Sequence, residues 1–172
     1  MRKLSDDYSS EVALKKLNSR FESSNAVAST IKKLTEKELC TLAALCDGNT
    51  ITTMGYNITA DYGVNRASAV VHSLKEKCSI PIASVSVNTI SDVNNATKQS
   101  KFFITSEDLD RLSTDPDMVL RNFQRESLLR KETLAQKEIK RLLRDYGKDG
   151  ILALIEHAAN DDNASDKVSS KN

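Results

Sequence analysis

Apolar residues recur at helical spacing between Asn65 and Cys78. One face of this stretch collects Ala67, Val70, Val71, Leu74 and Cys78. The opposite face carries Asn65, Ala69, His72 and Glu76, with Arg66, Ser68 and Ser73 beside it. Spacings of three, four and seven residues are typical of an amphipathic helix that buries one side. We therefore predict a helix over these residues, with Asn65 as its N-cap.

Two shorter helices are predicted before it. The first, from Thr35 to Cys46, opens with the capping-box pair Thr35 and Glu38 and ends at Asp47-Gly48-Asn49. The second runs from about Thr53 to Tyr62, and Gly63 is expected to end it in the left-handed conformation. Core packing is expected between two sets of residues, namely Val70 and Leu74 against Leu39, Leu42 and Ile58.

The pattern changes to strict alternation after Cys78. Residues 80–87 alternate apolar and polar side chains, and Lys101–Thr105 is a second strand candidate after a polar stretch. Three helices followed by a hairpin predict a mostly α, winged helix-turn-helix domain over residues 35–105.

A second amphipathic pattern begins near Thr114-Asp115-Pro116, where proline suits the first helical turn, and runs to Tyr146-Gly147. Its apolar side consists of Leu128, Ala135, Ile139, Leu142 and Tyr146. Its other side carries Arg130, Lys137, Lys140, Arg141, Arg144 and Lys148. A short apolar helix over Ile151–His157 follows, so residues 106–159 predict a C-terminal helical hairpin.

An apolar stripe of this length needs something to pack against, which predicts that residues 106–159 form an oligomerisation region. The alternative is packing on the chain's own N-terminal helix, around Val12 to Phe21. The basic side suits either phosphate contacts or ordinary solvation. A membrane-surface role is disfavoured because Glu132 and Glu138 lie on the polar side and the chain has no Trp.

The two ends lack large apolar groups. Residues 1–9 and 160–172 are rich in Ser, Asp and Asn, which predicts disorder there. The remainder of residues 1–34 is predicted to form an N-terminal helical arm. Ser23-Ser24-Asn25 is expected to be a linker or a helix cap before residue 35.

Residues 50–82 resemble the helix-turn-helix domain found in small bacteriophage and prophage proteins. The matching segments are Ile51-Thr52-Thr53, Tyr62-Gly63-Val64-Asn65-Arg66, Leu74-Lys75 and Ile80-Pro81-Ile82. The resemblance covers roughly a fifth of the chain. It implies DNA binding in the regulation of phage genes, without a catalytic site.

The predicted DNA-contacting residues are Thr53, Asn65, Arg66, Ser68, Ala69, His72, Ser73, Lys75, Lys98 and Lys101. Asparagine and arginine make paired hydrogen bonds to adenine and guanine edges. Asn65 equally suits capping, and Arg66 a structural ion pair. His72 suits a DNA contact, a solvated surface or, least well, a catalytic or metal role. Lys98 and Lys101 are as easily solvated as bound.

Charge and composition qualify this interpretation. The 172-residue chain has a net charge of +1, and residues 35–105 carry six basic and six acidic side chains. This neutrality weakens the DNA hypothesis, because phosphate contacts supply much of the affinity. The three cysteines show no metal spacing and are expected to be reduced core thiols. We expect no membrane span, no cofactor, no metal and no enzymatic activity.

The sequence therefore predicts an oligomeric, sequence-specific double-stranded DNA-binding protein in the cytoplasm of a bacterial host. A transcriptional regulator of phage or mobile-element origin is the favoured role. One alternative is a non-enzymatic DNA-organising factor in replication, partition or packaging. Another is a protein-interaction adaptor with a winged fold.

Overall fold

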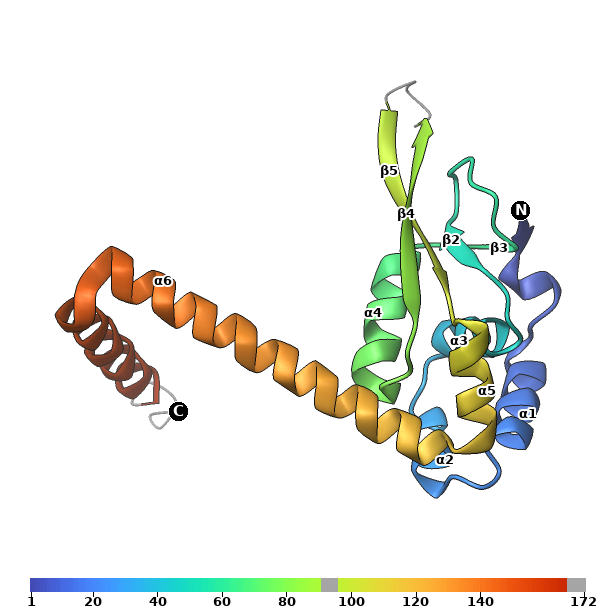
Figure 1. Ribbon diagram of the computed structural model, residues 1–172, viewed down its shortest axis with the longest axis horizontal. Coiled ribbons are helices and arrows are strands. Elements are labelled where there is room, and N and C mark those ends of the chain that lie inside the picture. The colour runs from blue at the N-terminus through green and yellow to red at the C-terminus, as the bar shows by residue number, and fades with distance from the viewer. Residues whose placement is uncertain (91–95, 167–172) are drawn as a thin grey trace. The chain divides into compact units, whose positions relative to one another are not determined.

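The computed structural model describes residues 1–90 and 96–166 (Figure 1). Its contacts divide the chain into two units, Met1–Arg125 and Glu126–Asn172. The described residues are mostly helical, as the sequence predicts, but they also contain one five-stranded sheet. The protein is therefore of mixed α/β type.

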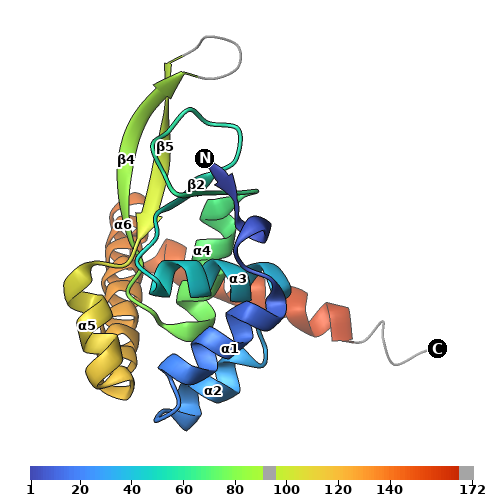
Figure 2. The ribbon, with the colours of Figure 1, turned by 90° about the vertical axis from the view of Figure 1, so that its right-hand side faces the viewer.

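Four α-helices precede the hairpin in the first unit: α1 Ser10–Arg20, α2 Asn25–Ile31, α3 Glu36–Cys46 and α4 Ala67–Cys78. Helix α3 contacts both α1 and α4, and α2 also contacts α4 (Figure 2). The predicted capping box of α3 is confirmed, since Thr35 and Glu38 satisfy each other's backbone amides. Ser24 is the N-cap of α2, and its side chain accepts a hydrogen bond from the amide of Val27.

The sheet has the strand order β1-β3-β2-β5-β4. Strands β4 (Ala83–Ile90) and β5 (Ala96–Phe103) form an antiparallel hairpin, from the pair Ala83 and Phe103 to the pair Ile90 and Ala96. This hairpin projects beyond the rest of the first unit (Figures 1 and 2). The predicted hairpin is confirmed, but both strands lie closer to its tip than the alternation indicated.

The predicted helix from Thr53 to Tyr62 is wrong. Strand β2 (Ile51–Thr53) and strand β3 (Tyr62–Val64) stand there instead, paired in parallel, with a loop between them. Two local features oppose a helix: the β-branched run at Ile51-Thr52-Thr53 favours a strand, and Gly55 has φ +95°. Strand β2 also pairs with β5, so the sheet satisfies backbone groups that a helix would have satisfied internally.

The predicted disorder of residues 1–9 is also wrong. Arg2–Lys3 forms β1, parallel to β3, and Leu4–Asp6 forms a 3₁₀ helix, η1. Tyr62 Oη donates a hydrogen bond to Asp7 Oδ2 at 2.6 Å, and the Arg2 guanidinium lies 2.8 Å from the same oxygen. Strand β3 and Tyr62 are distant in sequence from residues 1–9, which is why local composition did not indicate these contacts.

The core of the first unit joins the helices to the sheet. Its fully buried large apolar side chains are Leu17, Phe21, Leu42, Leu45, Ile51, Leu74, Ile80 and Leu112. The predicted packing partners Leu39 and Leu42 share this core with Leu74, but Ile58 lies outside the cluster. Cys40, Cys46 and Cys78 are all buried and unbridged, as predicted.

Helix α5 (Ser106–Thr114) belongs to the first unit, although residues 106–159 were predicted to form a separate region. The side chain of Leu112 belongs to the buried core. Hydrogen bonds from Arg20 of α1 link α5 to α1 and α3. The Arg20 guanidinium donates to the carbonyl of Cys46 at 2.7 Å and to Ser113 Oγ at 3.0 Å.

Helix α6 runs from Pro116 to Asp166, and Gly147 interrupts it with φ 68° and ψ 177°. The predicted start at Pro116 and the predicted break at Gly147 are confirmed. The helix continues through residues 160–166, where disorder was predicted, and residues 167–172 lie outside the described part of the chain. Residues of α6 from Glu126 onward form the described part of the second unit.

Candidate nucleic-acid interface

Helix α4 is amphipathic in the way that its sequence predicts. Ala67, Val71, Leu74 and Cys78 are buried, and Val70 packs against the same core. The residues on the other side are exposed, namely Asn65, Arg66, Ser68, Ala69, His72 and Glu76. This exposed face combines small side chains with one guanidinium, one imidazole and, toward its C-terminal end, the carboxylate of Glu76. The small side chains near its N-terminal end suit insertion into a groove.

The N-cap of α4 is Arg66, and the predicted capping by Asn65 is wrong. Arg66 adopts the left-handed conformation, with φ 56° and ψ 45°, and makes no side-chain cap. Its carbonyl accepts the first helical hydrogen bonds, from Ala69 and Val70. The strand β3 continues to Val64, so the chain must turn into the helix within two residues, and Arg66 takes that turn.

Gly63 does not end a helix, contrary to the prediction. It lies within strand β3, and its φ angle is not positive. A Cβ atom at this position would lie 2.7 Å from Met1 Cε, so the glycine gives room to the N-terminal segment. Thr53, predicted at the start of the second helix, is instead half-buried in β2 opposite Val64.

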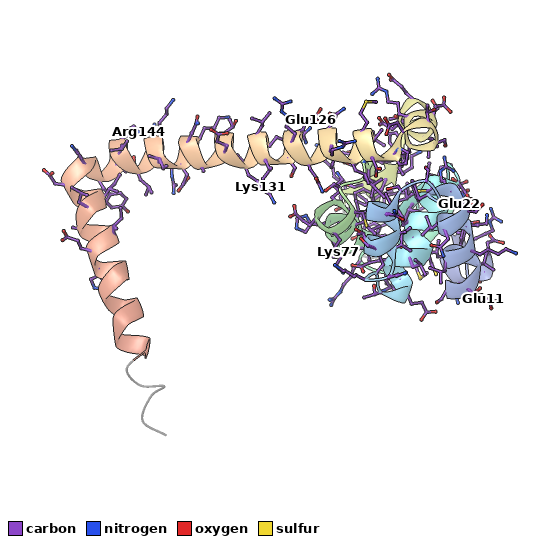
Figure 3. All side chains as sticks on the ribbon, turned by 90° about the horizontal axis from the view of Figure 1, so that it is seen from below. Glu11, Glu22, Lys77, Glu126, Lys131 and Arg144 are labelled. Carbon is purple, nitrogen blue, oxygen red and sulfur yellow. The ribbon has the colours of Figure 1, made fainter. Side chains whose placement is uncertain are left out.

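A buried carboxylate fixes α4 on α3. Glu38 Oε1 accepts a hydrogen bond from Ser73 Oγ at 2.5 Å, and Lys77 Nζ lies 2.7 Å from the same oxygen. Burial by itself would raise the pKa of Glu38, but hydrogen bonds from Lys77, Ser73 and Thr35 outweigh it and lower the pKa to about 2. Figure 3 labels Lys77 on α4.

This contact changes the role of Ser73. The sequence predicted a DNA contact, but the Ser73 hydroxyl is half-buried and is directed at Glu38 on α3. Lys75 is also only half exposed. Sequence reasoning identified Glu38 only as a cap and did not identify its bond to Lys77. The spacing of Ser73 and Lys77, four residues apart on one helix face, was the available signal.

The two hairpin lysines lie on opposite faces of β5, because they are three residues apart in a strand. Lys98 is exposed opposite Asn88, whereas Lys101 is half-buried and its charge contributes to lowering the pKa of Asp61. Hydrogen bonds from Thr50 are the main cause of that lowered pKa. Lys98 is therefore the freer of the two to meet a phosphate.

Arg66 and His72 face solvent without internal partners. Neither side chain forms an ion pair or a hydrogen bond with any residue that the structure describes, so the structural ion pair considered for Arg66 is not seen. Within the described residues, no group of three or more potential metal ligands gathers, around His72 or elsewhere. The charge of Arg66 is thus available for an external ligand.

The predicted oligomerisation stripe lies in the second unit. Leu128, Ile139 and Tyr146 are 67%, 55% and 59% exposed. Ala135 is also exposed, and Leu142 is half-buried. Helical geometry places the basic residues Lys137 and Arg144 on the other side of this helix. Figure 3 shows Glu126 and Arg144 on one side of α6 and Lys131 on the other.

No protein-family model, curated protein sequence or solved structure matches this chain. Among the described helices, none has a stretch long and apolar enough to cross a membrane.

Proposed function

We propose that the protein binds double-stranded DNA by placing the exposed face of α4 in the major groove. The observation that carries the proposal is the two-sided character of α4. Its buried side is anchored by Leu74 and by the bonds of Glu38 to Ser73 and Lys77. Its exposed side carries short side chains apart from Arg66, His72 and Glu76. A rigidly held helix with such a face can present side chains to base edges.

The order of elements supports a winged helix-turn-helix arrangement. Helix α3, strand β2, helix α4 and the β4–β5 hairpin follow one another, and β2 pairs with β5 at the base of the hairpin. A loop and β3 replace the expected second helix, so the proposal is a variant of that arrangement. In it, Arg66 contacts a base or phosphate and Lys98 contacts a neighbouring phosphate.

We propose regulation of transcription in a phage or mobile element as the role, on the strength of the motif around Tyr62–Arg66. The adaptor alternative is favoured by one observation, the equal number of basic and acidic residues over residues 35–105. A selection from random double-stranded DNA at several salt concentrations separates the two. Recovery of one sequence with salt-dependent affinity supports regulation. Recovery of no sequence contradicts sequence-specific DNA binding, and the absence of salt-dependent retention of any DNA contradicts DNA binding altogether.

Replacing Arg66 by glycine should weaken specific DNA binding and strengthen the fold at once. Loss of the guanidinium should cost about 1–3 kcal/mol of binding free energy. Glycine adopts φ 56° without the steric cost that arginine pays, so the free energy of unfolding should rise by about 0.5–1 kcal/mol. Fluorescence anisotropy with the selected DNA measures the first effect and urea unfolding the second.

Ser79→Gly is the matched control, because Ser79 also has positive φ, 54°, but caps the other end of α4. It should give a similar gain in stability with unchanged DNA affinity. Unchanged affinity of the Arg66→Gly variant would remove Arg66 from the interface.

We propose that the protein acts as an oligomer joined by the apolar side of α6. The exposed apolar side chains there, Ile139 among them, lie on one side of a helix whose other side is basic. A second copy can cover the apolar side while leaving the basic side in solvent. Two DNA-binding faces in one particle bind adjacent half-sites with higher avidity, which offsets the neutral charge of residues 35–105.

Replacing Ile139 and Leu142 by serine should therefore yield monomers that bind DNA more weakly. Light scattering at tens of micromolar protein measures the mass of the particle. The control variant carries Leu129→Ser and Leu134→Ser. The side chains of Leu129 and Leu134 are 53% and 65% exposed and lie on other sides of the helix, so this variant should keep the wild-type mass. A monomeric wild-type protein would contradict the proposal.

A further inference from the structure

A cavity of about 460 Å³ lies between the N-terminal segment, the first turns of α3 and the end of β3. Its volume falls within the range of about 300–1,000 Å³ that is typical of small-molecule sites. None of the residues proposed above for DNA contact lines it, except Asn65 at its edge. The DNA-binding proposal therefore leaves this cavity without a role.

The floor of the cavity is apolar and preformed. Leu4, Tyr8, Cys40 and Val64 line it and are all buried in the first unit. The Tyr8 hydroxyl is already engaged, since it donates to Asp47 Oδ2 at 2.7 Å and accepts from Asn49 Nδ2 at 3.0 Å. The ring of Tyr8 is thus fixed, and the floor offers a ligand apolar contacts rather than hydrogen-bond partners.

The rim carries the charge. Lys3, Lys37 and Glu36 line the cavity and are exposed, and none of them forms an ion pair with a described residue. Two ammonium groups against one carboxylate leave the rim with a net positive charge. An apolar floor under a positive rim complements a ligand that has an apolar body and one anionic group.

The cavity is connected to the start of α4. Val64 lines its floor and Asn65 its edge, and the next residue, Arg66, is the left-handed N-cap of the helix. Lys3, in the neighbouring strand β1, also lines the cavity and pairs with Gly63 of β3. A ligand held here contacts both β1 and the strand that sets the first turn of α4.

We propose that this cavity binds a small amphipathic carboxylate, with its hydrocarbon part on Leu4, Tyr8 and Val64 and its carboxylate between Lys3 and Lys37. Because the ligand contacts the segment that leads into Arg66, its binding changes the affinity of α4 for DNA. This second statement rests on the proposed function, whereas the binding itself does not.

Thermal unfolding of the 172-residue protein with sodium octanoate as the probe tests the binding without DNA. Millimolar octanoate should raise the melting temperature by about 2–4 °C, since a ligand that binds only the folded state stabilises it. Octylamine and 1-octanol at the same concentration provide the cationic and neutral comparisons and should raise it less. An equal or larger rise with octylamine overturns the charge assignment, and no rise with octanoate overturns the site.

Three variants locate the octanoate. Lys37→Glu should weaken binding at least fivefold by isothermal titration, while Lys33→Glu, an equal change of charge at an exposed residue outside the cavity, should not. Ser5 is exposed and lines the cavity. Ser5→Trp should therefore abolish octanoate binding, because the indole occupies the space of the ligand. Wild-type affinity in both Lys37→Glu and Ser5→Trp would place octanoate elsewhere and refute the site.

The coupling to DNA has its own measurement. Octanoate at saturation should change the affinity of the wild-type protein for its selected DNA at least threefold, and Ser5→Trp should remove that change. Octanoate binding with unaltered DNA affinity refutes the coupling alone. Failure of the protein to bind any DNA, with octanoate binding intact, refutes the proposed function and leaves the carboxylate site standing.

Discussion

Replacing Leu74 by alanine is expected to lower the free energy of unfolding by about 2–5 kcal/mol. The Leu74 side chain is fully buried, with 0% exposure, in the cluster that joins α4 to α3 and to the sheet. Truncation removes apolar contacts and leaves a cavity that a close-packed core refills only in part. Urea unfolding followed by circular dichroism measures the change.

Leu14→Ala is the control for this loss. Leu14 lies on α1 and is 39% exposed, so the same truncation there should cost less than about 1 kcal/mol. Equal losses in the two variants would mean that α4 does not bury the face containing Leu74. The DNA-binding proposal would then fail with it, because the exposed face of α4 is defined by the buried one.

Replacing Glu38 by glutamine is expected to destabilise the protein by about 2–3 kcal/mol at neutral pH. Glutamine keeps the shape of the side chain but removes the negative charge that accepts hydrogen bonds from Lys77 and Ser73. The Glu38 side chain is only 7% exposed, so solvent replaces little of the lost interaction. The partly exposed Lys77 keeps the effect below that of a fully buried pair.

The same variant predicts the pH dependence of stability. The pKa of Glu38 is lowered in the folded protein from 4.5 to about 2, so its stabilisation is complete above pH 5. It is lost progressively as the pH falls toward 2, where the folded protein takes up the proton. The difference in unfolding free energy between wild type and Glu38→Gln should therefore shrink across this range.

Glu36→Gln supplies the comparison, because Glu36 is exposed at the start of the same helix. It should cost little at any pH, and its difference from wild type should stay nearly constant. A difference between wild type and Glu38→Gln that is constant from pH 7 to pH 2 would exclude Glu38 as a charged clamp between α3 and α4.

Local sequence determined the elements whose stabilising contacts are local. Thr35 and Glu38 cap α3 within one helical turn, and the apolar spacing along α4 places Leu74 inward. Pro116 starts α6 and Gly147 interrupts it, as the backbone preferences of these residues dictate. In each case, the element is determined by residues within about four positions of one another, or by the backbone preference of a single residue.

Only the tertiary structure decided the features that depend on distant partners. Residues 51–53 and 62–64 form strands because β5 and β1 supply hydrogen bonds from remote parts of the chain. The same pairing orders residues 2–6, puts Arg66 rather than Asn65 at the start of α4 and creates the cavity beneath Lys3. Backbone pairing between segments some fifty to sixty residues apart leaves no periodic signal within either segment, so these contacts were not predictable from sequence pattern.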